Sequence, residues 1–293
     1  MNREKEIFRV TLVGSIVNVL LTVFKFVAGI VGRSSAMTAD AIHSLSDLLS
    51  DAVVMIFVKL SGRPVDSDHD YGHGKYETLA TIIVALMLAG AGLWLAIASA
   101  ADIFAGLNGA ELPEPTMLAL VAAVASVAAK EGLYRWTIYR ERRINSPLLV
   151  ANAWHHRSDA LTSVAAIIGI SGAMFLGGKW RLLDPGAAFV VSWFILAAAW
   201  KQCKPAIDIL LEKALPPETK DHIRRIILET PGVKAMHHLR TRNIGPGIAI
   251  ECHIKLDPDI SLRDAHEIAS QVEKRLRAEY GRKTHVGIHM EPY

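Results

Sequence analysis

Long apolar stretches in the first two thirds of the chain are the feature that most limits how it can fold. A helix needs about 20 consecutive apolar residues to cross the hydrocarbon core of a bilayer. Six stretches meet or approach this length, at about 10–31, 36–60, 79–104, 117–139, 147–176 and 182–200. Only helices and closed barrels satisfy every backbone polar group in lipid. The sequence therefore predicts an all-α bundle of six transmembrane helices over residues 1–210.

The remaining segment, residues 211–293 and hereafter the tail, is charged and mixed in composition. A helix pattern begins at Pro216 and Pro217, two strand-like runs follow, and a second helix is predicted at about 261–280 before a final strand. The predicted order is α-β-β-α-β. This order is typical of a small α+β domain with two helices on one face of a sheet.

Composition narrows the functional class. Hydrophobic residues make up 51% of the 293-residue chain, and the formal net charge of +3, without a single basic patch, argues against a nucleic-acid partner. Cys203 and Cys252 lie far apart, which argues against a disulfide framework or a thiolate metal cluster. The short charged N-terminus leads into an apolar stretch long enough to span a bilayer, so we expect a membrane helix there and no cleavable signal peptide.

The distribution of basic residues predicts the orientation in the membrane. Segments that would face the cytosol carry Arg3, Lys5, Arg9, Lys59, Arg63, Lys75, Arg135, Arg140, Arg142 and Arg143, whereas the outer loops carry Arg33, Lys179 and Arg181. Basic loops stay on the cytoplasmic side. We therefore expect a lipid-embedded protein with both termini in the cytoplasm, consistent with a bacterial inner membrane.

Two predicted spans carry the same pair of polar residues. His43 and Asp47 are four residues apart in one span, and His155 and Asp159 are four apart in another. That spacing places each pair on one helix face. Ionisable groups inside a membrane are costly and usually have a task, and two imidazoles with two carboxylates suit a tetrahedral zinc site. The other interpretation is polar helix packing, which the repetition of the pair in two helices disfavours.

Several other ionisable residues of the predicted spans are not expected to bind the metal. Asp40 and Asp51 are expected to line the pore or to have structural roles, and His156 to point away from His155. Lys25 is expected to extend toward the membrane interface.

Two further groups outside the spans have metal-binding spacing. The inner loop carries Asp66, His69 and His73, and the alternative is a solvated loop with incidental histidines. In the tail, one group falls on the predicted strands and the second helix: His237, His253, His266, His289 and Glu291. Surface histidines on a sheet are the alternative for this group.

Five sequence motifs, spread over nearly the whole chain, resemble those of the cation diffusion facilitators. The resemblance is closest to the bacterial branch that exports zinc and ferrous iron. The motifs are H-S-L-S-D (43–47), D-H-D-Y-G-H-G-K-Y-E (68–77), H-H-R-S-D (155–159), H-L-R-T-R (238–242) and I-H-M-E-P (288–292).

The resemblance implies a homodimer that exchanges a divalent metal for protons. It implies a transport site at His43, Asp47, His155 and Asp159, and a loop site at Asp66, His69 and His73. It also implies a dimer-linking tail site that includes residue 291, and a salt bridge between Lys75 and Glu212.

The expected function is proton-coupled efflux of Zn²⁺ by alternating access, with Zn²⁺ also bound as a structural or regulatory ion. His43 stands where the bacterial efflux relatives often have Asp, and a nitrogen-rich site favours zinc. Glu291 stands where Asp is usual, and Fe²⁺ and Mn²⁺ remain alternatives. One alternative is an intramembrane zinc enzyme, but the sequence lacks the H-E-x-x-H motif of such enzymes. Another is a metal sensor with an inert membrane bundle, but an inert bundle would have no reason to keep buried acid–histidine pairs.

Overall fold

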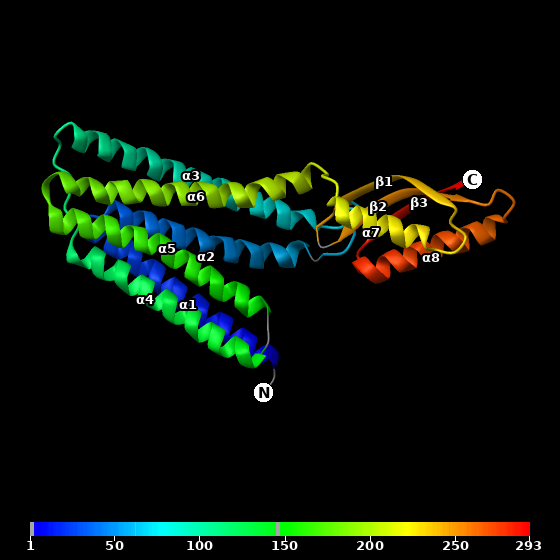
Figure 1. Cartoon of the computed structure of the whole chain (residues 1–293), viewed down its shortest axis with the longest axis horizontal. Coiled ribbons are helices and arrows are strands. Elements are labelled where there is room, and N and C mark those ends of the chain that lie inside the picture. Colours follow the sequence, from blue (N-terminus) through cyan, green and yellow to red (C-terminus); the bar gives the residue numbers. More distant parts are fainter. Residues whose placement is uncertain (1–2, 62, 145–146, 246) are drawn as a thin grey trace. The chain divides into compact units, whose positions relative to one another are not determined.

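The computed structural model describes residues 3–61, 63–144, 147–245 and 247–293 (Figure 1). Within the helices, some side chains lie outside the described part: those of residues 3–9, 11, 50–51, 54–55, 58–59, 141–144, 147–152, 155–156 and 158. The chain divides into two compact units. The first comprises Met1–Ala52 and Val84–Lys201, and the second Val53–Ile83 and Gln202–Tyr293.

Six long helices occupy the apolar part of the chain. They are α1 (Arg3–Val31), α2 (Ser35–Ser61), α3 (Lys75–Leu107), α4 (Met117–Ile144), α5 (Pro147–Leu176) and α6 (Leu183–Leu210). Helix α6 continues ten residues beyond the predicted end at Trp200 and passes through Pro205. Its added turns contain charged residues, and Lys204 Nζ donates to Asp208 Oδ2 at 3.2 Å.

Among the described residues, five helical segments are long and apolar enough to cross a membrane. They are Leu12–Val31, Lys75–Leu107, Met117–Arg140, Asp159–Leu176 and Gly178–Leu210. Helix α2 is the sixth long helix, and it carries Asp40 and Asp47 within its length. The predicted helical membrane domain with a small α+β tail is therefore confirmed.

Small side chains form the core of the first unit. One cluster joins α1, α2, α4 and α5 through Ala28, Ala36, Met37, Ala119, Ala122, Ala123, Ala166 and Ile170. A Cβ on Gly32 would lie 2.9 Å from the Cβ of Ala119, so a larger residue there would push α1 from α4. Small residues let membrane helices approach closely, which brings polar groups on neighbouring helices within bonding distance.

The tail contains α7 (Pro217–Leu228), β1 (Ala235–Asn243), β2 (Ile248–Leu256), α8 (Leu262–Tyr280) and β3 (His285–Pro292). Strand β2 is central, antiparallel to β1 and parallel to β3. A parallel pair needs a crossover, which α8 supplies. The α8 N-terminus is capped as predicted, because Ser261 Oγ accepts from the Asp264 N–H at 3.1 Å.

Alternation along β2 assigns the two faces of the sheet. Its buried residues pack with both helices in one core: Ile250, Cys252, Ile254 and Leu256 of β2, Ile223 and Ile227 of α7, and Val272 and Leu276 of α8. Both helices therefore cover the same face. Since side chains alternate along a strand, Glu251, His253 and Lys255 project from the opposite face.

Candidate metal centres

Three side chains of the first unit converge in what we call the membrane cluster: His43 and Asp47 of α2 and Asp159 of α5. One ligand atom from each lies within 4.8 Å of the others. His43 and Asp47 are half-buried, and Asp159 is 5% exposed. His155 lies one turn before Asp159 on α5, and its side chain lies outside the described part.

The donor set of the membrane cluster suits a divalent metal ion. Imidazole and carboxylate groups together accept zinc, iron and manganese. Within the described part of the chain, the buried Nδ1 of His43 has no hydrogen-bond partner. A buried polar atom without a protein partner is uncommon, so this nitrogen is available as a ligand.

A lysine that the sequence analysis did not assign to the site lies against it. Lys130 Nζ of α4 donates to Asp159 Oδ2 at 2.9 Å, and Lys130 is 3% exposed. The sequence shows a charged residue inside an apolar run. A charged residue in an apolar run indicates a buried charge but does not identify its partner. The pairing of Lys130 with Asp159 depends on how α4 packs against α5 (Figure 1).

A second buried ion pair corrects the prediction for Lys25. Lys25 does not extend toward an interface: its side chain is 0% exposed, and its Nζ lies 2.7 Å from Asp40 Oδ2. Lys25 also donates to Ser44 and Ser163, both at 3.0 Å. Asp40 in turn accepts from Thr162 at 2.9 Å and from Ser163 at 2.7 Å. These bonds join α1, α2 and α5, and Asp40 is not part of the membrane cluster.

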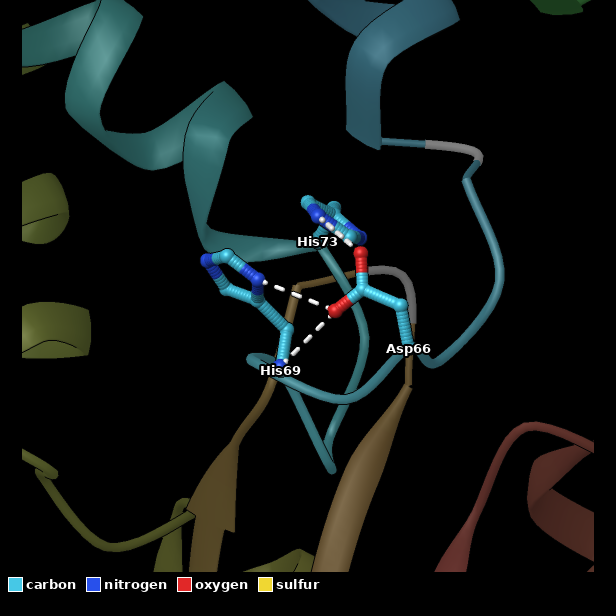
Figure 2. A group of neighbouring side chains, drawn as sticks. All are labelled: Asp66, His69 and His73. Atoms are coloured by element: carbon cyan, nitrogen blue, oxygen red, sulfur yellow. Dashed lines mark hydrogen bonds and ion pairs between the residues drawn. The ribbon is translucent and has the colours of Figure 1, made fainter.

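The loop before α3 forms the loop cluster, Asp66, His69 and His73 (Figure 2). Asp66 Oδ1 accepts from the His69 N–H at 2.9 Å, and Asp66 Oδ2 lies 3.3 Å from His73 Nε2. Gly72, with φ +75°, allows the turn between the histidines. Desolvation would raise the pKa of Asp66. Hydrogen bonds from Asp68 and His69 outweigh it and lower this pKa, so the carboxylate stays ionised.

Strand register builds the tail cluster, His237, His253 and Glu291. His237 pairs with His253, and His253 pairs with His289, so the three histidines form one row across the sheet. Glu291 lies 2.8 Å from His253 Nδ1, 3.2 Å from His237 Nε2 and 3.8 Å from His289 Nε2. The hydrogen bond from His253 lowers the pKa of Glu291, and the neighbouring histidines add to this effect.

Two histidines are placed differently from their sequence interpretation. His266 lies on α8 and is not among the residues that converge on Glu291. His238, which the sequence analysis did not place in the tail group, has its ring centroid 4.7 Å from that of His237 and 5.1 Å from that of His253. A bulge after His237 and a left-handed φ of 49° at His238 bring it there.

Ionic contacts of the second unit connect the start of α3 to the sheet. Lys75 donates to Glu212, as the family resemblance implies. Arg242 of β1 extends this contact, because it binds Glu212 and Glu251, both at 2.8 Å. Four charged residues therefore form one continuous network at the base of the tail.

Comparison with known proteins shows to which family the chain belongs. A family model described as the cation efflux transmembrane domain matches residues 11–211, and one described as the cation efflux protein cytoplasmic domain matches residues 215–293. The chain belongs to the cation efflux family. The resemblance to cation diffusion facilitators is thereby confirmed, and the chain is an integral membrane exporter of divalent metal ions and not an enzyme.

Relatives of this cation efflux protein include plant and bacterial proteins. Metal tolerance protein C1 of Arabidopsis thaliana is 35% identical over 98% of this chain, which spans only 62% of that protein. The manganese efflux system protein MneP of Bacillus subtilis is 31% identical over 99% of this chain and 98% of its own. The metal-bound C-terminal domain of the CzcD transporter from Thermotoga maritima is 29% identical over 27% of this chain and 94% of its own, with a TM-score of 0.24.

Proposed function

We propose that this cation efflux protein exports Zn²⁺ in exchange for protons, through a site formed by His43, Asp47, His155 and Asp159. The observation that carries the proposal is the membrane cluster. Donor atoms of His43, Asp47 and Asp159, from two helices, lie within 4.8 Å of one another. His155 precedes Asp159 by one helical turn and would complete a four-donor site.

Zinc is the first choice because two imidazoles and two carboxylates make a nitrogen-rich site. Manganese is the second candidate, since a relative aligned over almost the whole chain is named a manganese efflux protein. Ferrous iron is the third, because it accepts the same donors. The metals differ in preferred coordination, so flux competition among them is informative.

The chemistry of the ligands couples metal to protons. Imidazole must be neutral and carboxylate ionised to bind a metal, so protons leave the site as the metal enters it. Histidine changes its charge near physiological pH. Protonation of His43 or His155 from the outer side would therefore expel the metal in an outward-facing state, which gives exchange by alternating access.

The other two clusters would serve the same transport. We assign transport to residues 1–210 and metal-dependent homodimerisation to residues 211–293. The proposed ligands are Asp66, His69 and His73 in the loop, and His237, His253, His266, His289 and Glu291 in the tail. His266 would act from the partner subunit, since within one chain it is outside the tail cluster. We place the protein in a bacterial inner membrane with both termini in the cytoplasm.

Reconstituted transport tests the proposal. Purified protein in liposomes should move Zn²⁺ when a pH gradient is applied, and Asp159→Ala should reduce flux to the level of empty liposomes. The matched control is Asp221→Ala, an exposed carboxylate of α7 bound to Arg224, which should transport like the wild type. Wild-type flux from correctly inserted Asp159→Ala protein would remove Asp159 from the site. If Mn²⁺ moved and Zn²⁺ did not, the transported metal would be manganese and not zinc.

A further inference from the structure

The Lys130 ammonium holds one oxygen of a carboxylate that the proposed transport site requires. Its Nζ donates from α4 to Asp159 Oδ2 on α5 at 2.9 Å. The two side chains are 3% and 6% exposed, so water screens the pair poorly. Asp159 is also the α5 member of the membrane cluster with His43 and Asp47. One buried carboxylate therefore serves both a protein cation and the metal-binding group.

We propose that Lys130 competes with the transported metal ion for Asp159 and thereby sets the affinity of the site. The inference rests on the proposed function. A metal ion bound to a carboxylate oxygen lies about 2.0–2.2 Å from it, which is within a few ångströms of an ammonium on the same carboxylate. Like charges at that separation repel strongly in a medium of low dielectric constant.

This repulsion gives Lys130 a role in both directions of the exchange. Metal binding requires the ammonium to leave Asp159, which weakens the apparent affinity for the metal. Return of the ammonium to Asp159 replaces the lost positive charge and favours metal release. An exporter needs such a balance, because a site that binds its cargo too tightly releases it slowly.

The contacts of neighbouring charges single out Lys130 for this role. Glu131, the next residue, binds Arg135 at 2.7 Å and lies 3.9 Å from Arg157. The other buried lysine of the first unit, Lys25, is bound to Asp40, which is not in the membrane cluster. Lys130 therefore donates directly to a carboxylate of that cluster, whereas Lys25 donates to Asp40.

Flux kinetics in liposomes with a fixed pH gradient test the competition. Lys130→Met removes the competing charge, and the KM for Zn²⁺ should fall at least about tenfold, or about 1.4 kcal/mol. Lys130→Gln, which keeps a hydrogen-bond donor without the charge, should show the same fall. Lys130→Arg keeps the charge and should retain a KM close to that of the wild type. A merely structural pair would reduce the amount of active protein and leave KM unchanged.

Lys25→Met is the matched control for loss of a buried lysine. It should reduce the yield of folded protein, and its KM should fall less than that of Lys130→Met, because Lys25 binds Asp40, which is outside the membrane cluster. An unchanged or raised KM in folded Lys130→Met and Lys130→Gln overturns the competition. Failure of both neutral variants to fold also overturns it, because the pair would then be a requirement of folding. The Asp159→Ala variant keeps the two proposals separate: its normal flux would refute the transport site, whatever the Lys130 variants show.

Discussion

The membrane cluster and the tail cluster use the same side-chain types in opposite electrostatic settings. Around the membrane cluster, two buried carboxylates are held by protein cations, Asp159 by Lys130 and Asp40 by Lys25. In the tail cluster the carboxylate of Glu291 lies among histidines and is 28% exposed. A buried charge in a low-dielectric region needs an opposite charge close by, whereas water can stabilise a half-exposed one.

This difference suggests separate tasks for the two clusters. In the membrane, a carboxylate that already has a cationic partner can exchange it for a metal ion, which suits reversible transport. In the tail, a row of imidazoles around one carboxylate has no lysine competitor among the described contacts of Glu291. Such a site would retain metal more stably, which suits a structural or sensing ion.

The largest expected effect comes from breaking a buried pair. Lys25→Met removes the ion-pair partner of the buried Asp40 carboxylate, which keeps the hydroxyl donors Thr162 and Ser163. We expect the free energy of unfolding to fall by about 3–5 kcal/mol, measured by denaturant titration in mixed micelles. Lys75→Met is the matched control at an exposed pair. Lys75 is 37% exposed, and Arg242 still binds Glu212, so the loss should be about 0–1 kcal/mol. Equal losses of unfolding free energy in Lys25→Met and Lys75→Met would show that the buried and the exposed ion pair contribute equally to stability.

An intermediate effect is expected from removing a tail ligand. If the tail cluster retains metal, Zn²⁺ at 100 times its dissociation constant should stabilise the tail by about 2.7 kcal/mol. Hydrogen exchange of the β2 amides in the full chain measures this gain. His253→Ala should abolish most of it, because His253 is the central histidine of the row.

The matched control for that experiment is His222→Ala. His222 is 40% exposed on α7 and contacts Glu279 at 3.0 Å, away from the tail cluster. Its removal should leave the zinc-dependent protection of β2 unchanged. Zinc protection that survives His253→Ala, or that is lost in both variants, would contradict a retained metal at the tail cluster.

Sequence patterns predicted the elements of this protein well, because their signals are local. The lengths of apolar runs predicted the six long helices, five of which contain described segments long and apolar enough to cross a membrane. The four-residue spacing placed His43 with Asp47 on one helix face. The tail order followed from turn residues and from the cap at Ser261. Helix α6 was the main boundary error, since its last turns contain charged residues and continue beyond the apolar run that ends at Trp200.

Pairings between elements could not be predicted, because they depend on packing that the pattern does not record. Lys130 meets Asp159 only once α4 and α5 pack at a particular rotation. Lys25 has the length to reach an interface, and the Asp40 carboxylate is what holds it inside. In the tail, the row of histidines depends on strand register, and the place of His238 depends on a bulge. A shift of one residue would move each histidine to the other face.

The smallest expected effect is a pH dependence confined to the tail. The hydrogen bond from His253, with the adjacent histidines, holds the pKa of Glu291 below its ordinary value of 4.5. Above that value the carboxylate is ionised in both the folded and the unfolded chain, so its stabilising contribution is fully present. As pH falls, the unfolded chain takes up the proton first, and the contribution disappears as pH passes through the lowered pKa of the folded state.

Comparison with Glu291→Gln isolates this contribution. With metal chelated, wild-type β2 amides should exchange more slowly than those of the variant at about pH 5.5, and the difference should shrink as the pH is lowered through the pKa of the folded state. Asp221→Asn on α7, an exposed carboxylate bound to Arg224 outside the tail cluster, should show no such difference for β2. A gap between wild type and Glu291→Gln that widened toward pH 3 would mean that the carboxylate destabilises the sheet. The tail cluster would then resemble the membrane cluster, as a carboxylate that needs a cation to remain in place.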